Sequence, residues 1–318
     1  ALQLVDVAAK AGANAVKFQT FKAEQVVTAA GKLAEYQKKN LNATENQLNM
    51  LRQLELKEEF YQPIIARCQE RKIIFLSTPH GGKSSVDFLE SLDIAAYKIG
   101  SGDLTNFILL DKIAKTGKPI ILSTGMATLA EVRSTLKFLH SRGNDQVIIL
   151  HCTTSYPCFF EDVNLAAMVT MMRKFDSPVG YSDHTLGNQV AIMAIALGAA
   201  VYECHFTLDK KLPGPDHKAS ANPQELEEKI RAIRNVKKIM GSPQKTPTSK
   251  EKIEMMPLVR RSIVAAHSMK AGHILSEDDI EAKRPDNGLS PIYYEQSLGK
   301  RLIRDFKRDE QILLRDLQ

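Results

Sequence analysis

Residues 178–185 read PVGYSDHT and residues 200–207 read AVYECHFT, and these two stretches bear most directly on the fold. Each is a short apolar run with β-branched or aromatic residues that ends abruptly in polar side chains. Such runs are typical of buried strands in a parallel sheet. The first run reaches His184 and the second reaches His205, so we expect two imidazoles at neighbouring strand ends.

Five similar runs precede these two, and amphipathic segments lie between most of them. The strand candidates are residues 14–18, 73–77, 96–99, 119–123, 147–151, 179–182 and 200–204. The helix candidates are residues 2–11, 84–91, 108–116, 129–141, 164–175, 189–197 and 224–240. Alternation of apolar strands with helices predicts a parallel sheet covered by helices.

The order of these elements favours a (β/α)8 TIM barrel that lacks its first strand. A closed barrel of this kind has eight strands, and the sequence offers seven candidates. The helix at residues 2–11 has no strand before it, so we expect the missing strand upstream of residue 1. The alternative is a seven-stranded open or doubly wound sheet.

A polar, proline-containing linker at residues 241–257 separates the barrel domain, residues 1–240, from a small β-rich domain, residues 258–318. The net charge of +6 is spread along the 318 residues without a basic block, which argues against nucleic acid as a partner. No apolar run reaches the roughly 18 residues that span a bilayer. Four cysteines in a chain of this length favour a reducing, cytoplasmic setting.

In a (β/α)8 barrel the active site lies at the carboxyl ends of the strands. Here those ends carry Lys17, Gln19, Ser77, Thr78, Lys98, Ser101, Asp103, Ser123, Thr124, His151, Thr153, Thr154, Tyr156, Ser182, Asp183, His184, Glu203 and His205. Lysines, hydroxyls and imidazoles of this kind are suited to handling a substrate. Two histidines on neighbouring strands suit one divalent cation, although each could instead cap its strand by hydrogen bonding.

Lys17 and Lys98 interrupt apolar runs, and a buried lysine is costly unless it meets an anion. They predict a pocket for phosphate or carboxylate. Two alternatives remain open: the lysines extend to the barrel rim, or Lys98 forms a Schiff base as in barrel aldolases. We expect the loop at residues 214–217, which reads GPDH, to bring Asp216 to the barrel mouth; a plain turn is the alternative.

Taken in order, the motifs resemble the sialic acid synthases, the NeuB-type family, over essentially the whole chain. The motifs are VKFQT at 16–20, YKIGSGD at 97–103, LSTGM at 122–126, HCTTSYP at 151–157, GYSDHT at 180–185, ECHFT at 203–207 and GPDH at 214–217. The tail, from RRSIV at 260–264 through KRP at 283–285 to LGK at 298–300, is similar to the antifreeze-like (SAF) domain.

The resemblance implies that phosphoenolpyruvate condenses with N-acetylmannosamine to give N-acetylneuraminate and phosphate. By this likeness His184 and His205 bind Mn2+ or Mg2+, and Asp103 handles the attacking water. The substrate-binding residues would be Lys17, Thr78, Lys98, Ser101, Thr154 and Ser182 for phosphoenolpyruvate, and Tyr156, Asp216 and Arg284 for the N-acetylated amino sugar. Arg284 would reach a partner subunit, which implies a domain-swapped homodimer.

Two departures from the family pattern raise alternatives. The family's opening strand, which supplies a catalytic carboxylate, is not found, and Thr154 stands where members often carry Asn. The sequence therefore leaves open a legionaminate, pseudaminate or 9-phosphate-type nonulosonate synthase, and an inactive truncated homologue. A metal-independent Schiff-base aldolase is the rival of a different class.

Overall fold

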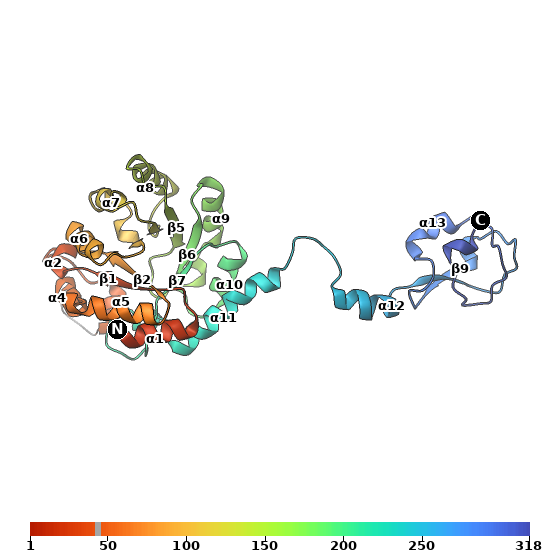
Figure 1. Cartoon of the computed structure of the whole chain (residues 1–318), viewed down its shortest axis with the longest axis horizontal. Coiled ribbons are helices and arrows are strands. Elements are labelled where there is room, and N and C mark those ends of the chain that lie inside the picture. Colours follow the sequence, from red (N-terminus) through yellow and green to blue (C-terminus); the bar gives the residue numbers. More distant parts are fainter. Residues whose placement is uncertain (42–45) are drawn as a thin grey trace. The chain divides into compact units, whose positions relative to one another are not determined.

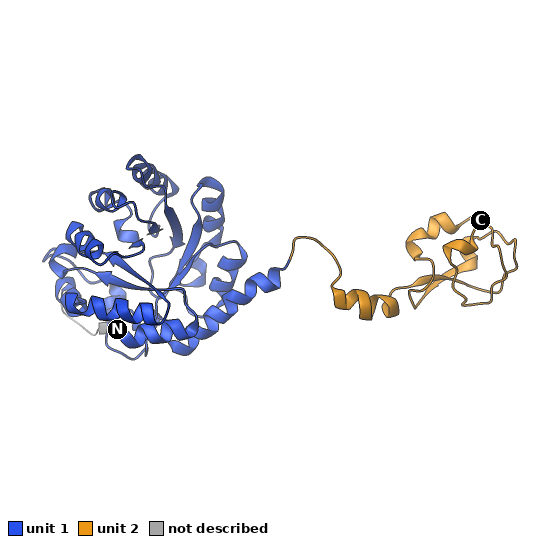
Figure 2. Cartoon of the chain, in the orientation of Figure 1, with its two compact units in different colours: residues 1–241 blue, residues 242–318 orange. Residues whose placement is uncertain are grey.

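The structure is a computed structural model that describes residues 1–41 and 46–318. The chain divides into two compact units, Ala1–Gly241 and Ser242–Gln318, coloured separately in Figure 2. Unit 1 holds the strand ends that the sequence analysis singled out, and unit 2 holds Arg284. No helix in the described part of the chain combines the length and the apolar character needed to cross a membrane.

Unit 1 is built on a seven-stranded parallel sheet whose strands follow one another in chain order. The strands are β1 (Ala15–Thr20), β2 (Ile74–Pro79), β3 (Tyr97–Ile99), β4 (Ile120–Ser123), β5 (Val147–Cys152), β6 (Val179–Asp183) and β7 (Tyr202–Cys204). This curled α/β sheet confirms the predicted fold class. The doubly wound alternative is wrong, because the strand order of such a sheet reverses at its centre and this order does not.

Helices surround the strands on the outside of unit 1 (Figure 1). The principal ones are α1 (Leu2–Ala11), α5 (Tyr61–Glu70), α6 (Lys83–Ser91), α7 (Phe107–Ala114), α8 (Leu129–Ser141), α9 (Leu165–Lys174), α10 (Gln189–Ala196) and α11 (Pro223–Met240). The sequence analysis missed α5 and the shorter helices α2 (Ala23–Val26), α3 (Glu35–Leu41) and α4 (Gln47–Leu54). In α5, Pro63 is tolerated because it lies in the first turn, where its missing N–H leaves no hydrogen bond unmade.

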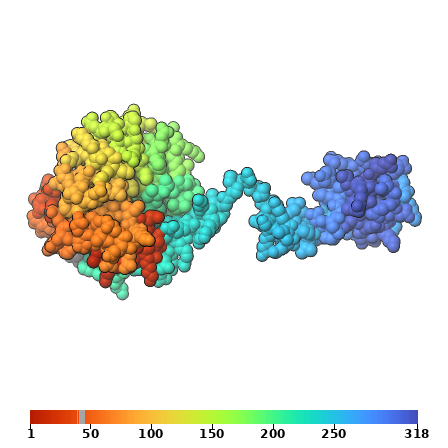
Figure 3. Space-filling model, viewed as in Figure 1, coloured from red at the N-terminus to blue at the C-terminus, as the bar shows by residue number. Residues whose placement is uncertain are grey.

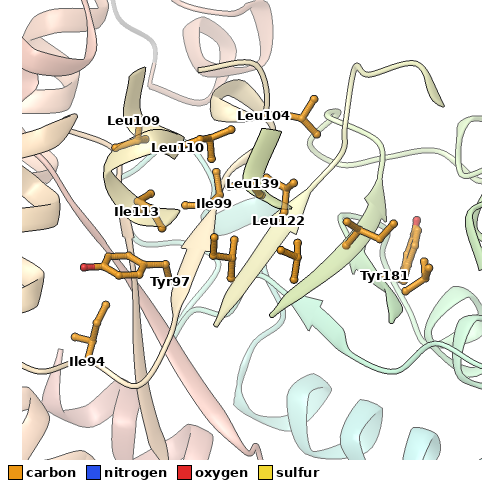
Figure 4. Packing of buried hydrophobic residues seen from close by; sticks show 14 of the residues in the cluster. Ile94, Tyr97, Ile99, Leu104, Leu109, Leu110, Ile113, Leu122, Leu139 and Tyr181 are labelled. Atoms are coloured by element: carbon orange, nitrogen blue, oxygen red, sulfur yellow. The ribbon is translucent and has the colours of Figure 1, made fainter. Parts of the chain in front are cut away.

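Alternate strand residues pack against the helices and form the main hydrophobic core. Tyr97 and Ile99 of β3 belong to this core with Leu122 of β4 and Tyr181 of β6 (Figure 4). Because side chains alternate across a strand, the residues between them face the interior of the curled sheet. Figure 3 shows the surface of the two units, coloured along the sequence.

A glycine on β6 allows the strands to approach closely at the interior face. A Cβ atom on Gly180 would lie 2.3 Å from the Val201 carbonyl oxygen and 2.7 Å from Leu150 Cδ2. Any larger residue would therefore push β6 away from its neighbours. Such a shift would move the polar strand end that follows.

Unit 2 contains a two-stranded antiparallel sheet of β8 (Ser262–Ala265) and β9 (Ile280–Lys283). Its own small core includes Ile263, Leu302 and Phe306. The predicted linker holds part of a helical segment, the π-helix Glu251–Met255 followed by α12 (Met256–Val259), and a short helix α13 (Tyr294–Ser297) lies near the end of the chain. The β-rich character predicted for the tail is confirmed, although some of its strand pairing consists of single bridges, such as Ile274 with Arg301.

Candidate active site

One partly buried carboxylate joins three strands at the interior of the curled sheet. Glu203 of β7 lies with its Oε1 atom 3.5 Å from Lys17 Nζ of β1 and 3.5 Å from Lys98 Nζ of β3. Ser182 of β6 donates a hydrogen bond to the same oxygen at 3.1 Å. Lys98 also donates to Ser123 Oγ at 2.7 Å. We call Lys17, Lys98 and Glu203 the charge cluster.

The cluster carries one more positive than negative charge. Burial alone would raise the pKa of Glu203, but the ammonium groups of Lys17 and Lys98 outweigh it and lower that pKa to about 2. Burial lowers the pKa of Lys98, and the charge of Glu203 opposes this shift. A net positive, largely dehydrated cluster is suited to an anionic ligand.

The two predicted histidines face one another beside this cluster. The ring centroids of His184 and His205 are 5.2 Å apart, and the rings are nearly perpendicular. His184 Nδ1 lies 2.7 Å from the Thr153 carbonyl oxygen. A carbonyl oxygen can only accept, so Nδ1 carries the proton and Nε2 keeps a free lone pair. Burial lowers the pKa of His184 and lowers that of His205 to about 3, so both rings are neutral.

Neutral imidazoles with a free nitrogen fit a divalent cation, and a backbone carbonyl often fixes the other nitrogen of a ligating histidine. The two histidines alone do not make up a full set of metal ligands. Among residues 1–41 and 46–318, no group of three or more His, Cys, Asp or Glu side chains is arranged to hold a metal ion. Among the described residues, His184 and His205 are the side chains placed to hold such a cation.

Aromatic contacts extend the site from the histidines to the loop that holds Asp216. The Tyr156 ring centroid lies 4.2 Å from that of His184 and 5.4 Å from that of Tyr36, on α3. Burial raises the pKa of Asp216, and a hydrogen bond with Tyr36 opposes this shift. Asp216 Oδ1 is buried without a hydrogen-bond partner among the described residues. It is therefore free to accept a hydrogen bond from a ligand.

A second group of polar side chains surrounds Gly125. Ser101 Oγ accepts a hydrogen bond from the Gly125 N–H at 3.0 Å. A Cβ atom at Gly125 would lie 2.3 Å from Thr154 Oγ1 and 2.8 Å from Ser101 Oγ, so a side chain there would displace these hydroxyls. Thr78 is buried near the carboxyl end of β2, in register with Gln19 of β1. The structure thus brings Ser101 and Thr154 together.

Asp103 follows β3 and is bound by two side chains, His80 and Asn106, at 3.0 and 2.9 Å. Arg284 lies in unit 2, where it is exposed. Its predicted contact with a partner subunit stays a prediction, as do the homodimer and the individual roles given to the site residues.

The loop that follows β6 is held by a buried network outside the sheet. Asp183 accepts hydrogen bonds from the backbone and hydroxyl of Thr185 at 2.8 and 2.7 Å and from the Tyr202 hydroxyl at 2.6 Å. Lys229 of α11 lies 3.7 Å from Asp183 and donates to the Gly187 carbonyl at 2.7 Å. His184 is enclosed between these anchored residues, so its position is fixed from the helix layer.

The predicted site residues omitted three that the structure places in or beside the site. Glu203 was recognised at a strand end, and that position was a sufficient signal to include it. His80 follows a proline in a turn-like stretch, and Tyr36 lies in an unpredicted helix. No pattern in the sequence marks the last two.

We expect Glu203→Gln to lower the free energy of unfolding at pH 7 by about 3 kcal/mol, because it leaves two largely buried ammonium groups without a counter-charge. The folded-state pKa of about 2 lies below the ordinary 4.5, so this stabilisation is present above pH 4.5 and is lost as the pH falls toward 2. Urea unfolding followed by circular dichroism across this range measures it.

The matched control is Glu24→Gln, which breaks an exposed pair with Arg52. This change should cost less than about 1 kcal/mol. Equal losses in the free energy of unfolding in the two variants would contradict the stabilising role given to the charge cluster.

Comparison with known proteins accounts for both units. Residues 4–245 match the model of the NeuB family, and residues 260–318 match that of the SAF domain. The chain is 45% identical over 314 residues to an N,N'-diacetyllegionaminic acid synthase of Campylobacter jejuni, covering 98% of this chain and 93% of that protein. It is 42% identical over 306 residues to the enzyme of the same name from Legionella pneumophila, covering 95% and 85%.

A solved structure of a similar protein supports the same assignment. The N-acetylneuraminic acid (sialic acid) synthetase of Leptospira borgpetersenii has a TM-score of 0.69 and 31% identity, and the match covers 80% of this chain and 84% of that one. The predicted resemblance is thereby confirmed. Since the family model spans most of the sequence and the relatives align over nearly all of it, the chain belongs to the NeuB family and ends in a SAF domain.

Proposed function

We propose that the protein condenses phosphoenolpyruvate with the open-chain aldehyde of an N-acetylated amino sugar, releasing phosphate and a nine-carbon keto acid. The observation that carries the proposal is the juxtaposition of a net positive charge cluster with two neutral, facing imidazoles. The first suits a substrate bearing phosphate and carboxylate. The second suits a cation beside an aldehyde oxygen.

In this proposal different residues bind the two substrates. Lys17, Lys98 and Ser182 bind the anionic groups of phosphoenolpyruvate, with Thr78, Ser101 and Thr154 around them. Tyr156 and Asp216 contact the amino sugar, for which the unpartnered Asp216 oxygen offers an acceptor. A Mn2+ or Mg2+ ion on His184 and His205 would supply Lewis-acid polarisation of the aldehyde.

The similar proteins favour a different sugar from the one first expected. The sequence analysis gave N-acetylneuraminate as the main product and legionaminate as an alternative. Two legionaminic acid synthases at 45% and 42% identity support the alternative better than a sialic acid synthetase at 31% supports the main expectation. We therefore propose N,N'-diacetyllegionaminic acid as the product. Removing the three carbons of pyruvate from such a nine-carbon acid leaves a diacetamido hexose as the acceptor.

The test is a competition assay with purified protein, phosphoenolpyruvate and divalent cation. An equimolar mixture contains the diacetamido hexose, N-acetylmannosamine and N-acetylmannosamine 6-phosphate, and products are separated by mass. We expect the diacetylated product to dominate. Predominance of N-acetylneuraminate would overturn the sugar assignment alone, whereas absence of phosphate release with every sugar would overturn the proposed function.

We predict that His184→Ala and His205→Ala each abolish turnover and weaken Mn2+ binding, because each removes one of two protein ligands. Calorimetric titration with Mn2+ measures the binding directly. His151→Ala is the control, since that ring lies on β5 and its Nε2 is bonded to the Val163 carbonyl at 3.0 Å. Unchanged Mn2+ affinity in both site variants would refute the metal assignment.

We predict that Lys98→Ala raises the KM for phosphoenolpyruvate by roughly 10- to 150-fold, the equivalent of one charge-assisted hydrogen bond. The KM for the sugar should change far less. Lys112→Ala, which removes a partly exposed lysine paired with Asp87, is the control. Steady-state kinetics with each substrate varied in turn make the measurement, and equal effects on both KM values would indicate a general structural role.

The Schiff-base alternative makes opposite predictions for the same lysine. A lowered pKa also suits an amine nucleophile, so burial of Lys98 alone does not separate the two. Trapping of Lys98 with pyruvate by borohydride, together with activity that survives EDTA, would favour the aldolase.

A further inference from the structure

A histidine that the predicted site set omitted lies at the mouth of unit 1. His80 directly follows β2, and Asp103 ends the short 3-10 helix that follows β3. Strands β2 and β3 are parallel neighbours, so both residues lie at the carboxyl edge of the sheet. His80 Nδ1 and Asp103 Oδ2 are 3.0 Å apart.

The Asp103 carboxylate is poorly placed to act as a base itself. Its Oδ2 atom is engaged by His80, and its Oδ1 atom accepts a hydrogen bond from Asn106 Nδ2 at 2.9 Å. Its side chain is only 15% exposed. Burial would raise the pKa of Asp103, but the hydrogen bonds from His80 and Asn106 outweigh it and lower that pKa. A carboxylate that holds its charge so firmly accepts protons weakly.

The imidazole has the complementary properties. An ionised carboxylate can only accept hydrogen bonds, so His80 Nδ1 carries the proton and a neutral ring keeps its lone pair on Nε2. The Nδ1 bond is the one hydrogen bond of this ring among the described residues, and the side chain is 28% exposed. A Cβ atom at Gly100 would lie 3.2 Å from His80 Cε1 and 3.4 Å from Nε2. The open edge of the ring therefore lies over Gly100, next to Ser101.

We propose that His80 is a catalytic base for the attacking water and that Asp103 is the positioning residue that orients its ring. The inference rests on the proposed function and reverses the role first given to Asp103. A carboxylate that orients an imidazole through Nδ1 while Nε2 does the chemistry is an established arrangement in unrelated enzymes. Histidine is the side chain that most often serves as a general base in proton transfer.

The step balances in atoms and charge. The water oxygen bonds to C2 of the enolpyruvyl unit after its C3 has joined the aldehyde carbon. One O–H bond of the water breaks, and its proton moves to His80 Nε2. The resulting imidazolium is stabilised by Asp103. The aldehyde oxygen gains one proton as it becomes a hydroxyl, which balances the proton that the water gives to His80. The second water proton leaves with the phosphate as the C2 ketone forms.

The decisive variant is His80→Asn, because the asparagine amide can still donate a hydrogen bond to Asp103 but cannot accept a proton. We expect kcat to fall by roughly 10²-fold or more, with little change in either KM. In His80→Ala, added imidazole should restore part of kcat. The matched control is His140→Asn, which changes another His–Asp pair, with Asp145, on the exposed end of α8. Thermal unfolding by circular dichroism checks that each variant is folded.

The outcomes separate this inference from the function on which it rests. A wild-type protein that releases phosphate, beside a folded His80→Asn variant of unchanged kcat, overturns the inference alone. A rise in KM with unchanged kcat also overturns it, since a merely structural pair would act that way. If the wild type releases no phosphate with any amino sugar, the proposed function falls and this inference falls with it.

Discussion

The carboxylate of Glu203, shared by Lys17 and Lys98, is the constraint on which the arrangement of unit 1 depends. The three residues come from β7, β1 and β3, and the first two strands are opposite edges of the sheet. With strands about 4.8 Å apart, a flat seven-stranded sheet would separate those edges by about 29 Å. The contact of 3.5 Å is possible only because the sheet curls until its edges approach. The inward-facing polar side chains at the strand ends are thereby turned toward a common centre.

That curvature explains how charged groups are tolerated in the interior. Two lysines alone would be expensive to bury, and one carboxylate offsets much of the cost while leaving a net positive charge. An anion entering the site would neutralise the remaining positive charge. The fold therefore already holds a charge that favours anion binding. The same enclosure keeps both histidines neutral, the form in which imidazole binds a cation. The charge cluster and the histidine pair therefore depend on the same enclosed environment.

The sequence predicted the strands well because each is a local apolar run, and their polar ends marked most of the site. It predicted the ends less well, since β1, β2 and β6 continue into Thr20, Pro79 and Asp183. Pairings between distant strands were beyond reach, because nothing local in β7 indicates that Glu203 meets residues of β1 and β3. His80 was missed because a histidine after proline in a glycine-rich turn resembles ordinary loop sequence. Lys229 resembled a solvated helix residue but is buried.

Because side chains alternate along a strand, adjacent residues of β6 point to opposite faces of the sheet and make different contacts. Ser182 points inward to the charge cluster, whereas Asp183 points outward to the network of Tyr202 and Lys229. His184, the next residue, returns to the interior beside His205. A change in α11 can therefore reach the histidine pair without touching it, through the anchored backbone on either side of His184. The helix layer thus supports the site as well as covering the sheet, because a rigid outer contact holds each inward side chain in place.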